Sequence, residues 1–382
     1  MNQLLFEQGP QGAAAALLKD NHLVEYLPLD SEEGILTESV YLGQVGRVMK
    51  PLGACFVALP GRQEGFLPCK QTKLQPGDRV LVQVKRPGVG SKTPHMTRDI
   101  ALSGRTLVYL PLGQGDKVSA RVEEKNDRQR LKTFAAAIPR QEGGFIMRHM
   151  SLHAEEPAIL QEAQSLVAQW ETLKEKAARL SPPVLLREAP HPLYRLLRDL
   201  QEQVDEVVTN DMDSLAFLGL PLRYAASPMA LYNVQEKLRK ALRRKVFLPS
   251  GASLMIDPCE AMTVIDVNSE KCTIGSHCGK TQVNLEAAEG IARLLRLRGV
   301  GGIVLIDFID MDTKEEREQV LAALSAHLKW DRVKTTVQGF TALGFVEMTR
   351  KRAEETLPAQ KGICPYCQGS GIKPLKEEDM HA

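Results

Sequence analysis

From residue 251 onward, short apolar strand patterns alternate with amphipathic helix patterns, and no other feature of the chain constrains its fold as strongly. The runs SLMID, MTVIDVNS and GGIVLIDFID predict strands, and the last of these is apolar enough to be buried. The runs LEAAEGIARLLRLRG and TKEEREQVLAALSAHL predict helices, and Gly299 closes the first. VKTTVQGF and GFVEMTR predict two further strands. This alternation indicates a layered α/β unit.

The N-terminal part of the chain carries a different pattern. After a predicted strand, turn and strand in residues 1–38, short alternating runs are broken by Gly and Pro. In PGDRVLVQVKR, for example, Val80, Val82 and Val84 take every second position. Frequent turns between short strands predict a small closed β-barrel. Since 382 residues exceed what one core usually holds, we expect two to four structural units.

Composition excludes several classes of protein. Hydrophobic residues make up 43% and charged residues 25%, as in ordinary globular proteins, and no run approaches the ~20 apolar residues of a membrane span. The start, MNQLLFEQGP, lacks a secretory pattern, so we expect a cytoplasmic protein. The net charge of +2 means that nucleic acid would have to bind through local basic patches. The densest, KLRKALRRK at 237–245, is predicted on a helix, and taken alone it favours a solvated face.

Two carboxylates stand at predicted strand ends. In VIDVNS, Asp266 and Asn268 share one face because strand side chains alternate, and Asp307 lies near the C-terminal end of an apolar strand. Open α/β sheets place their chemistry at such ends, and two neighbouring carboxylates suit Mg²⁺. The alternative is that each Asp caps a helix or pairs with an Arg. Phosphatases, kinases and nucleases all remain open at this point.

The cysteines suggest one metal site. Seven cysteines in 382 residues do not make a disulfide framework, and only Cys364 and Cys367 have the CxxC spacing of a zinc half-site. A redox pair is the alternative, but no thioredoxin-like context surrounds it. Cys272, His277 and Cys278 are a weak candidate for a second metal site.

Three blocks of sequence resemble one known family. LPSGASLMIDPCEAMTVIDVNS, NLEAAEGIARLLRLRGVGGIVLIDFIDM and DRVKTTVQGFTALGFVEMTRKR occur in that order, and CPYCQGSG follows them. They look like the ribonuclease E/G family, and the last block is most like its G-type members. The resemblance covers nearly the whole chain and is weakest across residues 112–185.

The resemblance implies a multi-domain α/β fold with an inserted S1 (OB) β-barrel. It implies an RNase H-like subdomain split between 1–38 and 194–242. Between these two segments it implies an S1 domain at 39–102 and a 5′-end sensor region at 103–193. After them it implies a DNase I-like catalytic domain at 243–358, a zinc-link CxxC at 359–373 and a polar tail at 374–382. The short tail implies a form without the family's C-terminal small domain.

The resemblance also implies an activity, endonucleolytic hydrolysis of single-stranded RNA in RNA processing or decay. Residues matching Asp266 and Asp307 bind Mg²⁺ in the family, and the residue matching Asn268 orients the site. The products carry a 5′-phosphate and a 3′-hydroxyl. Cys364 and Cys367 match a CxxC that shares one Zn²⁺ between two subunits, which implies a homodimer.

The implied RNA contacts fall into two sets. Phe56, Phe66 and Lys92 match the family's RNA-binding positions on the barrel, although alternation in CFVAL by itself places Phe56 in the core. A 5′-phosphate-binding set matches less completely, and its members are Arg148, His149, Val108 and Lys334. His149 stands where the family usually has threonine. The alternative for Arg148 is a surface ion pair.

The sequence departs from the family between the two carboxylates. Relatives carry a longer segment there, whereas this chain has EKCTIGSHCGKTQV at 270–283. The alternative function is therefore an RNA-binding protein of the same family with lost or reduced catalysis. The intact Asp266, Asn268 and Asp307 favour the enzyme.

Overall fold

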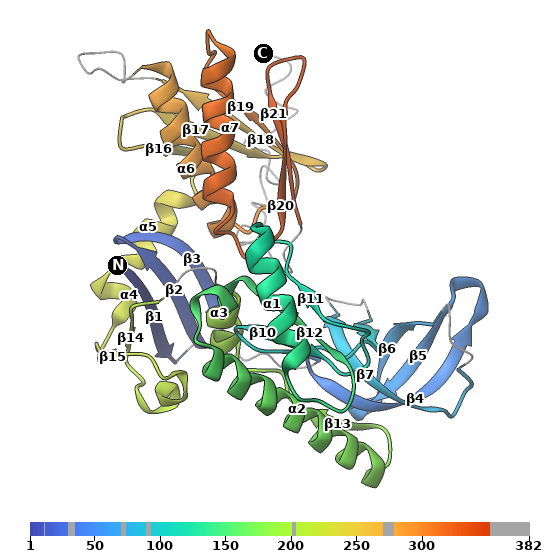
Figure 1. Ribbon diagram of the computed structural model, residues 1–382. Helices are drawn as coiled ribbons and strands as arrows, with labels where there is room; N and C mark the ends of the chain where they lie inside the picture. Colours follow the sequence, from blue (N-terminus) through green and yellow to red (C-terminus); the bar gives the residue numbers. More distant parts are fainter. Residues whose placement is uncertain are drawn as a thin grey trace, which may run out of the picture. The chain divides into compact units, whose positions relative to one another are not determined.

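A computed structural model of the chain describes residues 1–10, 12–29, 35–69, 74–88, 93–200, 204–269 and 279–351. The chain divides into two compact units. The first combines residues 1–30 with 202–382, and the second is residues 31–201. The fold is mixed α/β with an inserted barrel, as predicted (Figure 1).

A six-stranded sheet of the first unit carries the predicted carboxylates. Its order is β16-β17-β18-β19-β21-β20, in which β18 and β19 are parallel and all other neighbours are antiparallel. The strands are β16 (Lys245–Phe247), β17 (Ser253–Pro258), β18 (Met262–Asn268), β19 (Gly302–Asp307), β20 (Thr335–Phe340) and β21 (Val346–Arg350). Alternate residues of these strands are buried, so only one face belongs to the core.

Two helices, α6 (Lys280–Leu297) and α7 (Lys314–Leu328), cover that face (Figure 1). α7 begins at a capping box, in which the Glu316 amide donates to the Thr313 hydroxyl at 3.2 Å and the Thr313 amide donates to the Glu316 carboxylate at 3.0 Å. α6 is followed by Gly299, whose φ of 66° ends the helix. Both helices lie on the core face, so the opposite face, which carries Asp266 and Asp307, is not covered by them.

A second sheet of the first unit has the order β15-β14-β1-β2-β3. β1, β2 and β3 are antiparallel, whereas β14 and β15 run parallel to β1. Its elements and the neighbouring helices are β1 (Asn2–Gly9), β2 (Gly12–Lys19), β3 (His22–Leu29), β14 (Glu206–Thr209), η4 (Asp213–Leu218), β15 (Leu222–Tyr224), α4 (Pro228–Leu231) and α5 (Val234–Ala241). The sheet is therefore assembled from two segments that are distant in sequence.

The basic run at 237–245 is only partly helical. α5 ends at Ala241, and Lys245 already belongs to β16. The prediction of one basic helix was wrong. Val246 packs in the core of the six-stranded sheet, and this places Lys245, the end of the basic run, in β16.

The second unit contains the predicted β-barrel. β4 (Val40–Met49), β5 (Ala54–Leu59), β6 (Gln63–Pro68), β8 (His95–Thr97) and β7 (Arg79–Arg86) form a closed five-stranded cycle, since β7 also pairs with β4. Short turns η1 (Lys50–Leu52) and η2 (Pro60–Arg62) join the strands. Gly43 permits β4 and β5 to approach, because a Cβ there would lie 2.2 Å from a Val57 methyl group. The interior is filled by apolar side chains such as Val45, Val57 and Leu67.

The rest of the second unit is a four-stranded sheet of order β11-β12-β10-β9 with helices around it. Its elements are β9 (Leu102–Ser103), β10 (Leu107–Leu110), β11 (Lys117–Val118), α1 (Lys125–Ala137), β12 (Gly144–Met147), η3 (His149–His153), α2 (Glu156–Arg179), β13 (Val184–Arg187) and α3 (Pro192–Asp199). β13 pairs with β4 and so joins this part to the barrel. Across the described parts of both units, no helix has the length and apolarity to cross a membrane.

A buried ion cluster links the two sheets of the first unit. Glu25 on β3 is 5% exposed and accepts hydrogen bonds from Arg296 on α6, at 3.0 Å, and from Arg332. Burial alone would raise the pKa of Glu25, but the two guanidinium groups reverse the shift and lower it. Its stabilising effect is therefore present above the ordinary glutamate pKa of about 4.3 and is lost as the pH falls through the lowered value.

We predict that Glu25→Gln destabilises the first unit by about 3–5 kcal/mol, because it removes the counter-charge of the buried Arg296 guanidinium together with the ion pair to the more exposed Arg332. Urea unfolding at neutral pH measures the change. Glu236→Gln is the control, since Glu236 forms only an exposed ion pair with Arg239 and its loss should barely move the midpoint. Equal midpoints for the two variants would show that the cluster contributes nothing to stability.

Candidate active site

The structure places Asp266 and Asp307 side by side. β18 and β19 pair in parallel with a register in which Asp266 faces Asp307 directly. Asp307 is the last residue of β19 and is exposed, whereas Asp266 is half-buried. Asn268 lies two residues beyond Asp266 on the same face, and its Nδ2 donates to Asp266 Oδ2 at 2.6 Å. Asp266, Asn268 and Asp307, which the sequence predicts at strand ends, therefore lie together in the structure.

The pair carries uncompensated negative charge. The pKa of Asp307 is raised, first by burial and then by the neighbouring charges of Asp266 and Asp310. Among the residues that the structure describes, no Lys or Arg pairs with either carboxylate, and neither caps a helix. The alternative, in which each Asp caps a helix or pairs with an Arg, therefore does not fit these two residues.

The donor chemistry suits a hard divalent cation. No group of three or more His, Cys, Asp or Glu side chains occurs within the described ranges, so the candidate ligands are two carboxylates. Mg²⁺ is usually held by one or two carboxylates, with waters and substrate phosphate completing its coordination. Such a cation would offset the neighbouring negative charges that help to raise the pKa of Asp307.

The loop after Asp307 is held by side chains from both covering helices. Asn284 on α6 is fully buried and clamps Ile309, since Nδ2 donates to the Ile309 carbonyl at 2.8 Å and Oδ1 accepts from its amide at 3.1 Å. Glu316 on α7 accepts from the amide of Asp312 at 3.1 Å. These contacts fix the backbone that immediately follows the second carboxylate. Asn284 was missed in the sequence, because a polar residue inside a helical pattern gives no sign of what it contacts.

On the barrel, Phe56 and Phe66 face outward and form one aromatic surface. They are direct cross-strand partners on β5 and β6, and their rings meet edge to face at 5.9 Å. Phe56 is not in the core, because Cys55, Val57 and Leu59 are the residues of β5 that point inward.

Two residues that the sequence analysis missed extend this surface at both ends. The Arg47 guanidinium lies 4.8 Å from the centroid of the Phe56 ring, and the His95 ring lies 4.9 Å from that of Phe66. Arg47 reaches this position because the β4–β5 register shifts between Val45 and Val48. A bulge of this kind leaves no signal in hydrophobic alternation. We call Arg47, Phe56, Phe66 and His95 the barrel platform.

Three members of the predicted 5′-phosphate set lie in the second unit. Arg148 donates to Asp199 at 2.7 Å and to the Gly104 carbonyl at 2.8 Å, so it is in a part-buried ion pair. His149 Nδ1 is buried without a hydrogen-bond partner among the described residues, and the pKa of His149 is lowered, chiefly by burial. Val108 lies on β10, where it pairs with Ser103 and Ile146.

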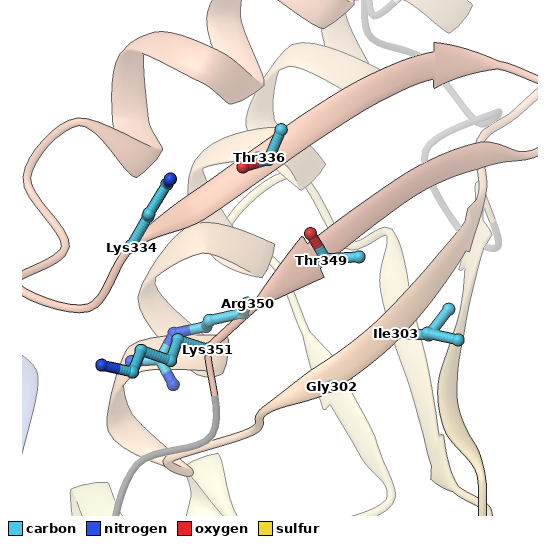
Figure 2. Close-up of a pocket in the computed structure, with 7 residues that line it drawn as sticks. All are labelled: Gly302, Ile303, Lys334, Thr336, Thr349, Arg350 and Lys351. Carbon is cyan, nitrogen blue, oxygen red and sulfur yellow. The ribbon is translucent and has the colours of Figure 1, made fainter. Parts of the chain in front are cut away.

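The fourth member, Lys334, lies in the first unit and lines a pocket of about 430 Å³ on the six-stranded sheet (Figure 2). The pocket is bounded by the start of β19 and by polar residues of β20 and β21, and its lining is Gly302, Ile303, Lys334, Thr336, Thr349, Arg350 and Lys351. Arg350 is paired with buried Asp331, so Lys334 and Lys351 are the charged groups that face the pocket.

The remaining candidates lie outside the described residues. They are Lys92, Cys272, His277, Cys278, Cys364 and Cys367. The three described cysteines are Cys55, which is buried, Cys69, which is half-buried, and Cys259, which is exposed.

Comparison with known proteins identifies relatives over most of the chain. The model of the ribonuclease E/G family matches residues 101–353. The chain is 32% identical to ribonuclease G of Escherichia coli K12, over 97% of this chain and 84% of that protein. It is also 32% identical to ribonuclease G of Haemophilus influenzae, over 97% and 83%, and to ribonuclease E of Synechocystis, over 87% and 55%. The chain thus spans about half the length of the cyanobacterial relative.

We predict that Asn284→Ala lowers the free energy of unfolding of the first unit by about 1–3 kcal/mol, because the Ile309 amide and carbonyl lose their partner in a buried site. Denaturant unfolding measures the loss, and repeating it with Mg²⁺ shows whether the loosened loop also weakens cation binding. Gln319→Ala, on the exposed side of α7, is the control and should change neither quantity. Wild-type stability in Asn284→Ala would mean that the loop does not depend on this clamp.

Proposed function

This chain belongs to the ribonuclease E/G family, and we propose that it is an endoribonuclease that hydrolyses single-stranded RNA with Mg²⁺ held by Asp266 and Asp307. The observation that carries the proposal is the direct pairing of these two carboxylates across parallel strands. An RNA-binding protein without catalysis would have no use for adjacent carboxylates that pair with no Lys or Arg of the described residues.

The chain's own residues supply position and charge. Asp266 and Asp307 provide the anionic ligands, Asn268 holds the Asp266 carboxylate by its 2.6 Å hydrogen bond, and Asn284 fixes the loop beyond Asp307. When bound, Mg²⁺ supplies Lewis-acid stabilisation of the phosphate and activation of a water molecule. In the balanced reaction, the water oxygen bonds to phosphorus, the bond from phosphorus to the 3′-oxygen breaks, and that oxygen takes a proton. The products then carry a 5′-phosphate and a 3′-hydroxyl.

We infer that the barrel platform binds the RNA. Outward aromatic rings with a cation at one end are the features by which barrels of this kind hold single strands, since bases stack on rings and phosphates attract cations. Phe56 and Phe66 form the centre, and Arg47 and His95 extend it. Lys92, which matches a family RNA-binding position, is proposed to act beside them.

Recognition of an RNA 5′-monophosphate is the finer proposal. Arg148 offers a guanidinium fork, and His149 offers an unsatisfied Nδ1 in the next position. Arg148 would have to exchange Asp199 for phosphate, which makes the ion pair a competitor of the ligand. Lys334, the remaining member of the set, lies in the first unit and lines the pocket in Figure 2 together with Lys351.

The subdomain names and the assembly are also proposals. The two-segment sheet of β1–β3, β14 and β15 supports the split RNase H-like subdomain, and the helix-covered six-stranded sheet supports the DNase I-like layer. A CxxC at Cys364 and Cys367 gives zinc only two of the four ligands that it requires. Two chains about a two-fold axis would complete the set, so we propose a homodimer that shares one Zn²⁺.

For catalysis, Asp266→Asn and Asp307→Asn should each abolish cleavage of a 5′-monophosphorylated, A/U-rich RNA oligomer while leaving RNA affinity nearly unchanged, because affinity comes largely from other surfaces. Gel-based cleavage and fluorescence anisotropy measure the two quantities. Asp257→Asn is the matched control, since Asp257 lies on the same face of the sheet but pairs with Arg244, and it should cut normally. Cleavage by the wild type that persists in chelator would sink the metal mechanism.

For RNA binding, Phe66→Ala should weaken single-strand affinity by about 1–3 kcal/mol, because a stacked base loses its ring. The substrate concentration at half-maximal rate should rise more than kcat falls. Leu52→Ala provides a control on the same barrel, since Leu52 is 56% exposed and lies outside the platform. If Phe66→Ala binds RNA normally, the platform is not the RNA site.

For assembly, Cys364→Ser combined with Cys367→Ser should release zinc and shift the protein from dimer toward monomer, because each shared ion then loses its four thiolates. Light scattering with metal analysis measures both changes. Cys259→Ser is the control because Cys259 is exposed but stands alone in sequence. A double variant that stays a dimer would refute the zinc link.

A further inference from the structure

An exposed aromatic side chain lies on the six-stranded sheet that carries Asp266 and Asp307, outside every site described above. Phe247 is 62% exposed on β16, the edge strand, and the Lys245 Nζ lies 5.2 Å from the centroid of its ring. Val246 between them is buried in the core, so Lys245 and Phe247 both point to the face that α6 and α7 leave open. Their neighbour Arg244 is neutralised by Asp257.

The register of the sheet aligns these two residues with the carboxylate pair. Lys245 is the cross-strand partner of Met255, which is the partner of Asp266, which in turn faces Asp307. Directly paired residues share a face of the sheet. Lys245, Met255, Asp266 and Asp307 therefore form one row across four strands.

A second row runs beside the first. Phe247 is the partner of Ser253, and Ser253 is the partner of Asn268. Since neighbouring strands are ~4.8 Å apart, Phe247 stands about 10 Å from Asn268, and Lys245 stands about 10 Å from Asp266. Both residues thus lie on the carboxylate face at the distance of a neighbouring nucleotide, and not at the opposite end of the strands where the pocket in Figure 2 is found.

Each side chain matches one part of a nucleotide. An exposed ring offers a face for stacking of any base, and a lysine ammonium attracts a phosphate. Under the proposed function, the scissile phosphate lies at the adjacent carboxylate pair, so RNA is the partner that would reach this ring and this ammonium. We propose that Phe247 and Lys245 form a nucleotide subsite of the active site, where a base next to the scissile bond stacks on the ring and its phosphate contacts the ammonium.

The inference rests on the proposed endoribonuclease function. The subsite would hold the strand on the catalytic sheet itself, separately from the barrel platform. Because every base presents a stacking face, it would fix the position of the strand without selecting a base. Lys245 would add salt dependence to binding, and Phe247 would add little.

The test begins with wild-type cleavage of a short RNA, whose cut position defines the scissile bond. RNA affinity is then measured in the Asp307→Asn background, with the intact oligomer and with oligomers carrying one abasic residue at successive positions. Phe247→Ala should weaken binding of the intact RNA by roughly 5- to 30-fold. One abasic RNA, with its missing base beside the cut, should bind the parent protein with the same loss of affinity. Phe247→Ala should not weaken the binding of that RNA any further.

Three further variants separate stacking from structure. Phe247→Tyr should bind as the parent does. Lys245→Gln should reduce the slope of log Kd against log salt by about one. Tyr224→Ala is the matched control, since Tyr224 is also 62% exposed but lies on the other sheet of the same unit, and it should bind normally.

The outcomes distinguish this inference from the proposed function. Wild-type protein that cleaves, together with Phe247→Ala that binds as tightly as the parent, overturns the subsite alone. The subsite is also overturned if the loss of RNA affinity from Phe247→Ala and the loss from the abasic residue multiply at every position, because the two changes would then act independently. A change of oligomeric state in Phe247→Ala with unchanged RNA affinity would assign the ring to a protein contact. Wild-type protein that does not cleave RNA at all overturns the proposed function instead.

Discussion

The parallel pairing of β18 with β19 is the constraint on which the site depends. Its register sets Asp266 opposite Asp307, and at a strand spacing of ~4.8 Å two ionised carboxylates repel by about 3 kcal/mol at an effective dielectric constant of about 20. The rest of the sheet resists this repulsion. α6 and α7 bury the opposite face, Asn284 clamps the loop beyond Asp307, and Asn268 donates to Asp266. The fold therefore maintains a concentration of negative charge that no Lys or Arg in the described ranges neutralises, as a site for a divalent cation requires.

Each unit contributes a different part of the proposed chemistry. The first unit holds the carboxylates on a sheet whose two covering helices make it rigid, and the Glu25 cluster ties that layer to the second sheet. The second unit presents the barrel platform on a closed barrel that has no free edge. Catalysis needs exact placement of charge, whereas RNA binding needs exposed rings and cations. Placing the two on separate rigid surfaces lets each meet its own requirement.

Much of this could be predicted from the sequence. The strands and helices after residue 251 follow the hydrophobic pattern, and alternation already puts Asp266 and Asn268 on one face. The barrel was predicted from its turns, and it is closed by a pairing between β4 and β7. Family resemblance supplied Phe56, which alternation alone would have buried. The structure shows why alternation misleads there, since Cys55 and Val57 fill the barrel and leave Phe56 outside.

What could not be predicted depends on register and on distant contacts. Arg47 joins the platform through a bulge, and Phe247 reaches the face that carries Asp266 and Asp307 through two successive antiparallel pairings. The basic run leaves its helix at Ala241 because Val246 belongs to a sheet whose other strands lie further along the chain. No local pattern contains that information.

An RNA that carries one phosphorothioate at the cleaved bond shows whether Asp266 and Asp307 hold a cation at the scissile phosphate. Sulfur is a poor ligand for Mg²⁺ and a better one for softer metals. We expect single-turnover cleavage of this RNA to slow strongly in Mg²⁺ and to recover in Mn²⁺ or Cd²⁺, with no recovery in Asp307→Asn. Cleavage that is equally fast with either oligomer and any added metal, or that continues in chelator, would contradict it.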